Sequence, residues 1–257
     1  MSQISAVFKP GHKALIAYIT LGYPTLETSY QAAITLAGNG CDIIELGIPF
    51  SDPLADGTTI QTASYAALQN GVTPPVCLDV ARQLSSRMDT PLIFMTYINP
   101  VMCSGVERFI YESGDAGVAG MIVPDLPPEE GSKLQAAAHG QGLDIIYLLA
   151  PNSPDERISL VSRQSSGFIY LVSLTGVTGT SETLSDSLDE FICRVRALTS
   201  LPLCVGFGIS SAEQARRAAQ KADGVIIGSK LIQLIEEDRS LSKLRDFLVG
   251  IRGAIDS

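Results

Sequence analysis

Residues 44–57 read Ile-Glu-Leu-Gly-Ile-Pro-Phe-Ser-Asp-Pro-Leu-Ala-Asp-Gly. The stretch begins as an apolar run and turns abruptly into a loop of Pro, Asp and Gly. A helical pattern, residues 58–69, follows the loop. An apolar run, a loop and a helix in this order form one unit of an α/β fold. The run also contains a carboxylate, Glu45, which is costly to bury unless it is paired or used.

The same unit recurs along the whole chain. We expect strands at residues 14–20, 42–48, 91–98, 120–125, 144–149, 168–173, 202–207 and 224–227. Each run is continuously apolar, which is typical of parallel strands covered on both faces. Helical patterns occupy the intervening residues 26–38, 105–117, 129–140, 155–165, 188–198 and 211–222. Ser210, followed by Glu213, is the expected cap of the last of these helices.

Eight strand–helix units without a break in composition predict one α/β domain, a closed (β/α)8 TIM barrel over residues 1–257. A doubly wound open sheet is the alternative, because both folds repeat the same unit. In a barrel, the loops after the strands form the active-site end. Two such connections are long, residues 49–90 and 174–201, and the second contains a run of small polar residues that predicts a lid over a ligand.

Composition and charge exclude several classes of protein. Hydrophobic residues make up 46% of the chain and charged residues 18%, so a large core can form. The net charge of −9 argues against nucleic acid or an anionic membrane as a partner. No apolar run is long enough to span a membrane, and the first residues do not resemble a secretory signal, so a cytoplasmic location is expected.

The cysteines and histidines give no sign of a metal site. The five cysteines are scattered without a C-x-x-C pair, and the two histidines lie near expected loops or element ends. Buried, reduced thiols are the simplest interpretation. The motifs of zinc proteases, serine hydrolases and P-loop enzymes do not occur in the sequence.

Glu45 is the first candidate for catalysis. It lies near the end of its strand, where barrel enzymes carry their catalytic groups. If its face of the strand points into the barrel, desolvation raises its pKa and makes it a proton donor and acceptor. A structural carboxylate held by hydrogen bonds is the alternative.

Two loop carboxylates, Asp52 and Asp56, follow within a dozen residues. Each has a structural interpretation, because Asp52 precedes Pro53 in a turn-forming pair and Asp56 can begin a turn or cap the next helix. Their position on a loop that starts at the strand of Glu45 makes them candidates for the same site.

The last two expected strands end in glycine, at Gly206 and at Gly228, which Ser229 follows. Glycine lets an anion approach the backbone, and the helix that follows offers free N–H groups. The corresponding loops are the common phosphate site of barrels. Together with Gly176 they predict a phosphate cradle, although glycines needed only for tight turns would give the same pattern.

Aromatic residues near the strand ends can form the walls of a pocket for a flat ring. The candidates are Tyr18, Phe50, Tyr97, Tyr170 and Phe207. Each can equally belong to the barrel core.

At residues 45–57 the chain follows the pattern E-L-G-x-P-F-S-D-P-x-A-D-G without a break, and by this pattern it resembles the tryptophan synthase alpha subunits. Further matches span nearly the whole chain in the same order. They are Thr20-Leu21-Gly22 with Pro24, Asp125 with Pro127, Ser173 with Gly176-Val177-Thr178-Gly179, Gly206-Phe207-Gly208-Ile209-Ser210, and Gly228-Ser229.

The resemblance implies a lyase of tryptophan biosynthesis that cleaves indole-3-glycerol phosphate to indole and glyceraldehyde 3-phosphate by a retro-aldol reaction, without a metal. It implies that Glu45 is the general acid–base and that Asp56 stabilises the indole N–H. It assigns substrate contacts to Tyr18, Tyr97, Tyr170, Thr178 and Phe207, and phosphate contacts to Gly176, Gly206, Gly228 and Ser229.

The resemblance also implies a partner. This is a beta subunit that carries pyridoxal phosphate, receives indole through a tunnel and forms an alpha-beta-beta-alpha complex. The alpha chain itself then needs no cofactor. Asp52, Pro53 and Asp125 are expected to face that partner.

The chain departs from the family pattern in three places. The segment before the first strand is short, which leaves open how the floor of the barrel, the end opposite the active-site loops, is closed. Leu174 stands where some members have Arg, and Thr58 where Pro is frequent. Three other functions remain open: a stand-alone lyase, a barrel that only binds a partner, and a phosphosugar isomerase, although the last usually needs a Lys or His at a strand end.

Overall fold

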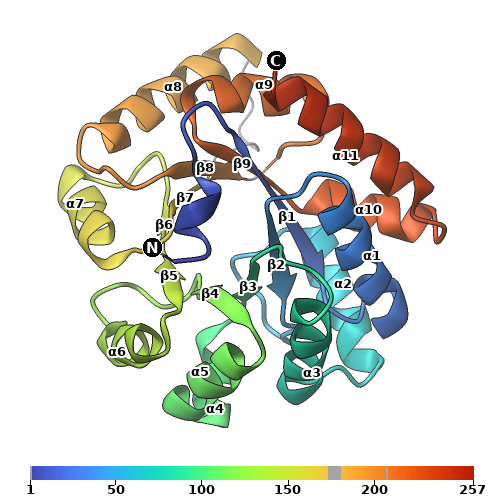
Figure 1. Ribbon diagram of the computed structural model, residues 1–257. Helices are drawn as coiled ribbons and strands as arrows, with labels where there is room; N and C mark the ends of the chain where they lie inside the picture. The colour runs from blue at the N-terminus through green and yellow to red at the C-terminus, as the bar shows by residue number, and fades with distance from the viewer. Residues whose placement is uncertain (1, 173–180, 207) are drawn as a thin grey trace.

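A computed structural model describes residues 2–172, 181–206 and 208–257 of the chain. Parallel strands form the centre, and helices surround them (Figure 1). The strands are β1 Ala14–Thr20, β2 Ile43–Gly47, β3 Leu92–Met95, β4 Val118–Ile122, β5 Asp144–Ile146, β6 Leu148–Leu149, β7 Ile169–Val172, β8 Leu203–Gly206 and β9 Gly224–Ile227. The expected strands all form, but most are shorter than predicted, and β4 begins two residues earlier and ends three residues earlier than the expected strand 120–125.

The sheet nearly closes into a barrel. Its strand order is β5-β4-β3-β2-β1-β9-β8-β7-β6, and every pairing is parallel. The two ends of this order, β5 and β6, are consecutive pieces of one segment interrupted only at Tyr147. The backbone carbonyl of Tyr147 accepts a hydrogen bond from the Tyr170 N–H at 3.1 Å. The predicted barrel is therefore confirmed, with its fifth strand in two pieces.

The helices form the outer layer. They are η1 Ser5–Val7, α1 Leu26–Gly38, α2 Thr58–Gln69, α3 Pro74–Ser85, α4 Ile98–Ser104, α5 Val106–Asp115, α6 Ser132–Gln141, α7 Asp155–Gln164, α8 Ser181–Arg196, α9 Ala212–Lys221, α10 Ser229–Glu237 and α11 Ser242–Ile255. The long connection after β2 contains α2 and α3. The expected cap of α9 is wrong by one residue, since Ser211, and not Ser210, accepts the hydrogen bond from the backbone of Gln214.

Alternate residues of each strand contribute to two cores. One apolar set packs between the sheet and the helices. The other fills the barrel interior and includes Ile16 and Tyr18 of β1, Ile43 of β2 and Ile93 of β3. Because Glu45 is two residues after Ile43 on the same strand, its side chain shares the interior face. The prediction that Glu45 faces the barrel interior is therefore confirmed.

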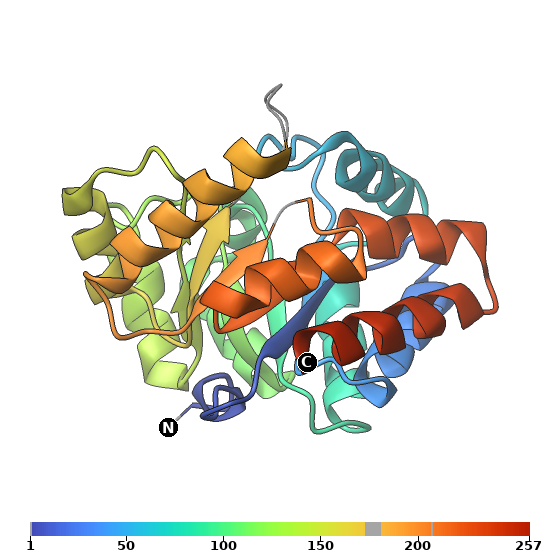
Figure 2. The ribbon, with the colours of Figure 1, turned by 90° about the horizontal axis from the view of Figure 1, so that it is seen from above.

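The short N-terminal segment closes the floor of the barrel. Ile4 is fully buried, and Phe8 lies against Phe168 with ring centroids 6.0 Å apart. Gly120 and Gly167 make room for Ile4, since a Cβ built on either would approach its side chain within 3 Å. The segment lies at the lower end of the barrel in Figure 2. A few residues are therefore enough to close an end that the sequence left in question.

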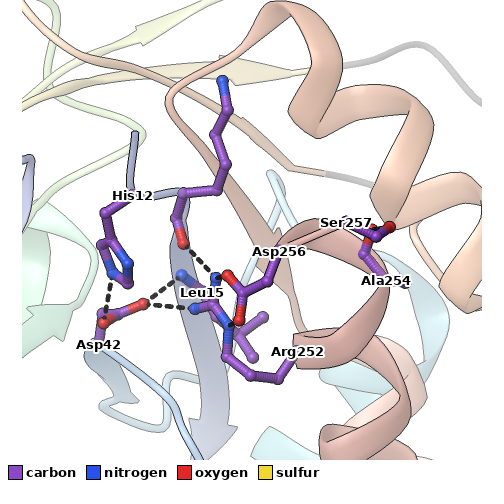
Figure 3. A network of polar contacts seen from close by, with 8 residues as sticks. His12, Leu15, Asp42, Arg252, Ala254, Asp256 and Ser257 are labelled. Atoms are coloured by element: carbon purple, nitrogen blue, oxygen red, sulfur yellow. Dashed lines mark hydrogen bonds and ion pairs between the residues drawn. The ribbon is translucent and has the colours of Figure 1, made fainter. Parts of the chain in front are cut away.

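A polar network ties the end of the chain to the same floor (Figure 3). Arg252 of α11 donates to Asp42 Oδ2 at 2.9 Å and to the Lys13 carbonyl at 2.7 Å, and it pairs with Asp256. Asp42 also accepts from the Leu15 N–H and bonds to His12, each at 2.8 Å. The network joins α11 to the starts of β1 and β2.

Candidate active site

A cavity of about 190 Å³ opens at the carboxyl ends of the strands. Glu45 and Asp56 both line it, with Tyr18 of β1 and Tyr170 of β7. The remaining lining residues are Met95 of β3, Ile226 of β9, and residues of the loops after β2, β8 and β9 and of the helices that follow β2 and β9: Gly57, Ile60, Gly208, Ile209, Ser210, Gly228, Ser229, Lys230 and Gln233. The structure thus brings together carboxylates, tyrosines and glycine-rich loops that the sequence placed at separate strand ends.

Glu45 is 0% exposed, and neither of its carboxylate oxygens has a hydrogen-bond partner among the described residues. Its neighbours across the sheet are Tyr18 on β1 and Ile93 on β3. Burial without a compensating charge raises the pKa of Glu45 to about 8. The group is therefore protonated at neutral pH and can act as a proton donor.

Asp56 lies on the loop between β2 and α2, and the Tyr97 hydroxyl holds it in place. This hydroxyl donates to Asp56 Oδ2 at 3.0 Å and accepts from the Ala55 N–H at 3.0 Å. The other oxygen, Oδ1, is buried without a partner in the described part of the chain. Burial raises the pKa of Asp56 to about 6, while the Tyr97 hydrogen bond acts to lower it. Asp56 is therefore mainly ionised at neutral pH, with one oxygen available.

Tyr97 was expected to form a wall of the pocket for a flat ring, but the structure places it elsewhere. Its hydroxyl is used in holding Asp56, and its ring stacks on Phe50 with centroids 5.3 Å apart. It is not among the described residues that line the cavity. No sequence signal reveals this contact, because 41 residues separate Tyr97 from Asp56.

Two tyrosine rings of the cavity lie against glycines of adjacent strands. A Cβ built on Gly47 would come within 2.2 Å of the Tyr18 hydroxyl oxygen, and one on Gly206 within 2.3 Å of that of Tyr170. Gly206, which we expected at the phosphate, thus makes room for the Tyr170 ring. Gly208 lies two residues further along, has φ +81° and lines the cavity.

Gly208, Ser210, Gly228 and Ser229 line the cavity where the loops after β8 and β9 border it. Gly228 is the N-cap of α10, without a side-chain cap. The first N–H groups of a helix have no acceptor within the helix, and they bear the positive end of its dipole. A phosphate at this end would satisfy both. Lys230 and Gln233, which our sequence reasoning missed, follow the Gly228-Ser229 pair by one and four residues.

The residues expected at the partner surface lie outside this cavity. Asp52 is exposed and accepts a short bond from the Ser51 hydroxyl, and Pro53 beside it is buried. Asp125 is exposed and accepts from the Ile98 N–H at 2.9 Å, at the start of α4. Leu54, which follows Pro53 on the loop that carries Asp56, is 91% exposed.

Three residues named from the sequence, Gly176, Thr178 and Phe207, lie outside the described residues, as does Leu174. Thr58, in the place where Pro is frequent, is the first residue of α2.

A larger hollow of about 1010 Å³ lies at the floor, lined by His12 and Asp42 among others, but those two side chains are already bonded to each other.

The described residues contain no helix that could cross a membrane. Nor do they contain a cluster of three or more His, Cys, Asp or Glu side chains placed to hold a metal ion.

Known proteins similar to this chain share both its sequence and its fold. The profile of the family described as "Tryptophan synthase alpha chain" matches residues 4–249. The tryptophan synthase alpha chain of Dehalococcoides mccartyi is 54% identical over 256 residues, covering 100% of both chains. That of a Geobacter species, strain M21, is 46% identical over 262 residues, covering 99% of this chain and 98% of the relative.

Solved structures of related proteins have the same fold. Tryptophan synthase subunit alpha from Legionella pneumophila superposes with a TM-score of 0.92 at 35% identity, covering 100% of this chain and 99% of that chain. A chain of Mycobacterium tuberculosis tryptophan synthase gives a TM-score of 0.92 at 38% identity, with the same coverage.

Proposed function

The chain belongs to the tryptophan synthase alpha chain family, and on this premise we propose that it cleaves indole-3-glycerol phosphate to indole and glyceraldehyde 3-phosphate. The proposed reaction is a retro-aldol cleavage, carried out by the cavity at the strand ends. The observation that supports it best is Glu45, a fully buried carboxyl group with both oxygens unpaired, in the same cavity as Asp56.

Glu45 would supply the proton that starts the reaction and take up the one that ends it. As an acid with a pKa of about 8, it can protonate the indole C3 at neutral pH. The carboxylate that remains can then accept the proton of the glycerol hydroxyl. As that hydroxyl becomes an aldehyde, the carbon–carbon bond breaks and its electrons return to the indole ring. Glu45 is protonated again at the end of the cycle.

Asp56 would stabilise the positive charge that protonation of C3 places on the indole N–H. Its Oδ1 is buried and unpaired in the described structure, so an N–H donor can satisfy it. A carboxylate in a buried cavity interacts strongly with such a charge, because little water screens it. The two carboxyl groups thus divide the work: Glu45 stays protonated and Asp56 ionised, which their pKa values of about 8 and about 6 support.

The phosphate would lie at the other end of the cavity, against the N-terminus of α10. Gly208, Ser210, Gly228 and Ser229 line that end. From the sequence, Gly176 and Gly206 are expected in the same role, and Thr178 and Phe207 are expected to contact the substrate. Tyr18 and Tyr170 also line the cavity and would contact the body of the substrate.

A beta subunit that carries pyridoxal phosphate is the proposed partner, in an alpha-beta-beta-alpha complex. The exposed residues Asp52, Leu54 and Asp125 support a partner surface beside the catalytic loop. In this proposal the alpha chain itself uses no cofactor.

Two other functions make different predictions. A stand-alone lyase would use the same chemistry and turn over rapidly without a partner. A barrel that only binds a partner has no use for Glu45, whose unpaired burial costs free energy of folding. The unpaired Glu45 therefore favours an enzyme over a scaffold.

The test is Glu45→Gln, assayed for indole release from indole-3-glycerol phosphate. Gln keeps the shape of the side chain but cannot transfer the proton, so we expect a loss of on the order of 10²-fold or more in kcat. Circular dichroism and calorimetric binding of glycerol 3-phosphate should stay near the wild-type values. Glu107→Gln on the surface of α5 is the matched control. Near-normal turnover in Glu45→Gln would refute the mechanism.

A further inference from the structure

The start of α10 carries a positive charge where a helix usually avoids one. Lys230 is the second residue of α10, and the first turn of this helix contains no acidic residue. Two other helices, α6 and α11, also have a lysine as their second residue and no acidic residue in the first turn. A cation beside free N–H groups opposes the helix dipole. A lysine at this position therefore favours an anion beside it, supplied by the protein or by a ligand.

Nothing within the described structure compensates this charge. Lys230 is partly buried, and no carboxylate of the described residues forms an ion pair with it. Lys133 and Lys243, by comparison, pair with Glu107 and Glu237 at 3.2 Å. Lys230 therefore has a charge available for a ligand.

Lys230 lines the same cavity as Glu45 and Asp56. It is the one cation among the described lining residues, and it directly follows Gly228 and Ser229. Glu45, fully buried and unpartnered, lines the same cavity from the barrel interior. The cavity thus has an acidic part at the strand ends and a basic part at α10.

We propose that Lys230 is a binding residue for the phosphate of the substrate, in addition to the glycines and Ser229. This inference rests on the proposed function. Backbone N–H groups offer only partial charge to a dianion, and a flexible ammonium adds a full charge that can follow the phosphate oxygens. In a chain with a net charge of −9, such local attraction matters for an anionic substrate.

The charge also sets the direction in which the substrate binds. With the phosphate against Lys230, the indole lies toward Glu45 and Asp56. The opposite orientation would place the dianion beside the ionised Asp56 and leave Lys230 unpaired. Lys230 is thus a residue that fixes the substrate's orientation as well as its affinity.

The experiment compares Lys230→Gln and Lys230→Arg with the wild type, and Lys221→Gln on α9 serves as the control. A charge-assisted hydrogen bond predicts that Lys230→Gln raises KM for indole-3-glycerol phosphate and the Kd of glycerol 3-phosphate by roughly 10- to 100-fold. We expect kcat to change by less than about threefold, because the group binds phosphate in the ground state and the transition state alike. Arg should restore most of the affinity, and added salt should weaken binding less in the Gln variant.

A measurement on the unaltered chain complements the variants. Glycerol 3-phosphate should protect the Lys230 amine, and not that of Lys221, from reductive methylation followed by mass spectrometry. Equal affinity in Lys230→Gln and wild type, or no protection of Lys230, would overturn the inference. A wild type that binds glycerol 3-phosphate through Lys230 but does not release indole would instead contradict the proposed function alone.

Discussion

Glu45 and Asp56 are two carboxyl groups in one cavity with pKa values raised to different extents, to about 8 and about 6. Burial is the main cause for both, but Asp56 also accepts a hydrogen bond from Tyr97. Separated pKa values of this kind assign the acid and base roles. The sequence predicted that these two residues share a site, because both lie on one strand and its following loop.

The pH dependence of the reaction follows from these values. As pH falls below about 6, Asp56 gains a proton and loses its negative charge, and as pH rises above about 8, Glu45 loses the proton that it donates. We therefore expect a bell-shaped profile of kcat/KM with limbs near these two values. Steady-state assays across the range measure it. In Asp56→Asn the remaining activity should lose the acid limb, and an acid limb that persists would assign it to another group.

Tyr97 is a positioning residue for Asp56 that the sequence could not reveal. Tyr97→Phe removes a hydrogen bond that lowers the pKa of Asp56, so that pKa should rise. Since Asp56 must be ionised, the acid limb of kcat/KM should move to higher pH, and stability should fall by about 1 kcal/mol. Tyr65→Phe, an exposed residue on α2, is the control. An unchanged acid limb in Tyr97→Phe would mean that the contact is merely structural.

The positions of whole strands could be predicted from the apolar runs, but the exact ends of strands and helices could not. The strands occur where continuous apolar runs predicted them, because burial on both faces leaves a strong signal. The cap of α9 was misplaced because Ser210 and Ser211 are both good capping residues, and only the geometry of the turn selects Ser211. Likewise, Lys230 at the start of α10 carries no signal of its own, since its role depends on loops distant in sequence.

The last helix, α11, depends on Arg252 for its attachment to the barrel floor. The Arg252 side chain is 16% exposed and bonds to Asp42, Asp256 and the Lys13 carbonyl. Arg252→Ala would remove the donor to the Lys13 carbonyl and the ion-pair partner of the partly buried Asp42, and should lower the free energy of unfolding by roughly 2–4 kcal/mol.

Urea titration measures this change. Arg245→Ala on the same helix, whose ion pair with Asp246 is exposed at 3.6 Å, should change stability by less than about 0.5 kcal/mol. Equal effects of the two substitutions would show that the network does not hold α11. The kcat of the folded Arg252→Ala variant should match wild type, because the network lies at the end of the barrel away from Glu45.

In the whole molecule, the two ends of the barrel have different roles. One end, the floor, carries contacts that stabilise the fold, and the opposite end, the mouth, carries the proposed active site. The sequence predicted the barrel and its catalytic end, because eight strand–helix units fit few other folds. It did not predict how the floor is closed. Ile4 does so through shape, by fitting beside Gly120 and Gly167, and shape complementarity between distant residues leaves no pattern in a sequence.

The mouth also carries the surface for the proposed partner. Leu54 is 91% exposed and only two residues from Asp56, so a beta subunit that covers Leu54 would hold the catalytic loop. We expect added beta subunit to raise the rate of indole formation, and Leu54→Asp to abolish this increase while leaving the rate of the isolated chain unchanged. Gel filtration and the indole assay measure both effects.

Val249→Asp on the exposed face of α11 is the control for the partner experiment, because α11 is attached to the floor of the barrel and Leu54 lies at the opposite end. This variant should respond to the beta subunit as the wild type does. A complex that forms equally well with Leu54→Asp would place the partner elsewhere, and no complex with the wild type would favour the stand-alone lyase.

The network at the floor brings Arg252 within 2.7 Å of the Lys13 carbonyl, so the first strand and the last helix meet. Because a chain is synthesised from its N-terminus, Arg252 becomes available only after every described strand has been made. A nascent barrel therefore lacks this connection between its floor and α11 until that helix has emerged.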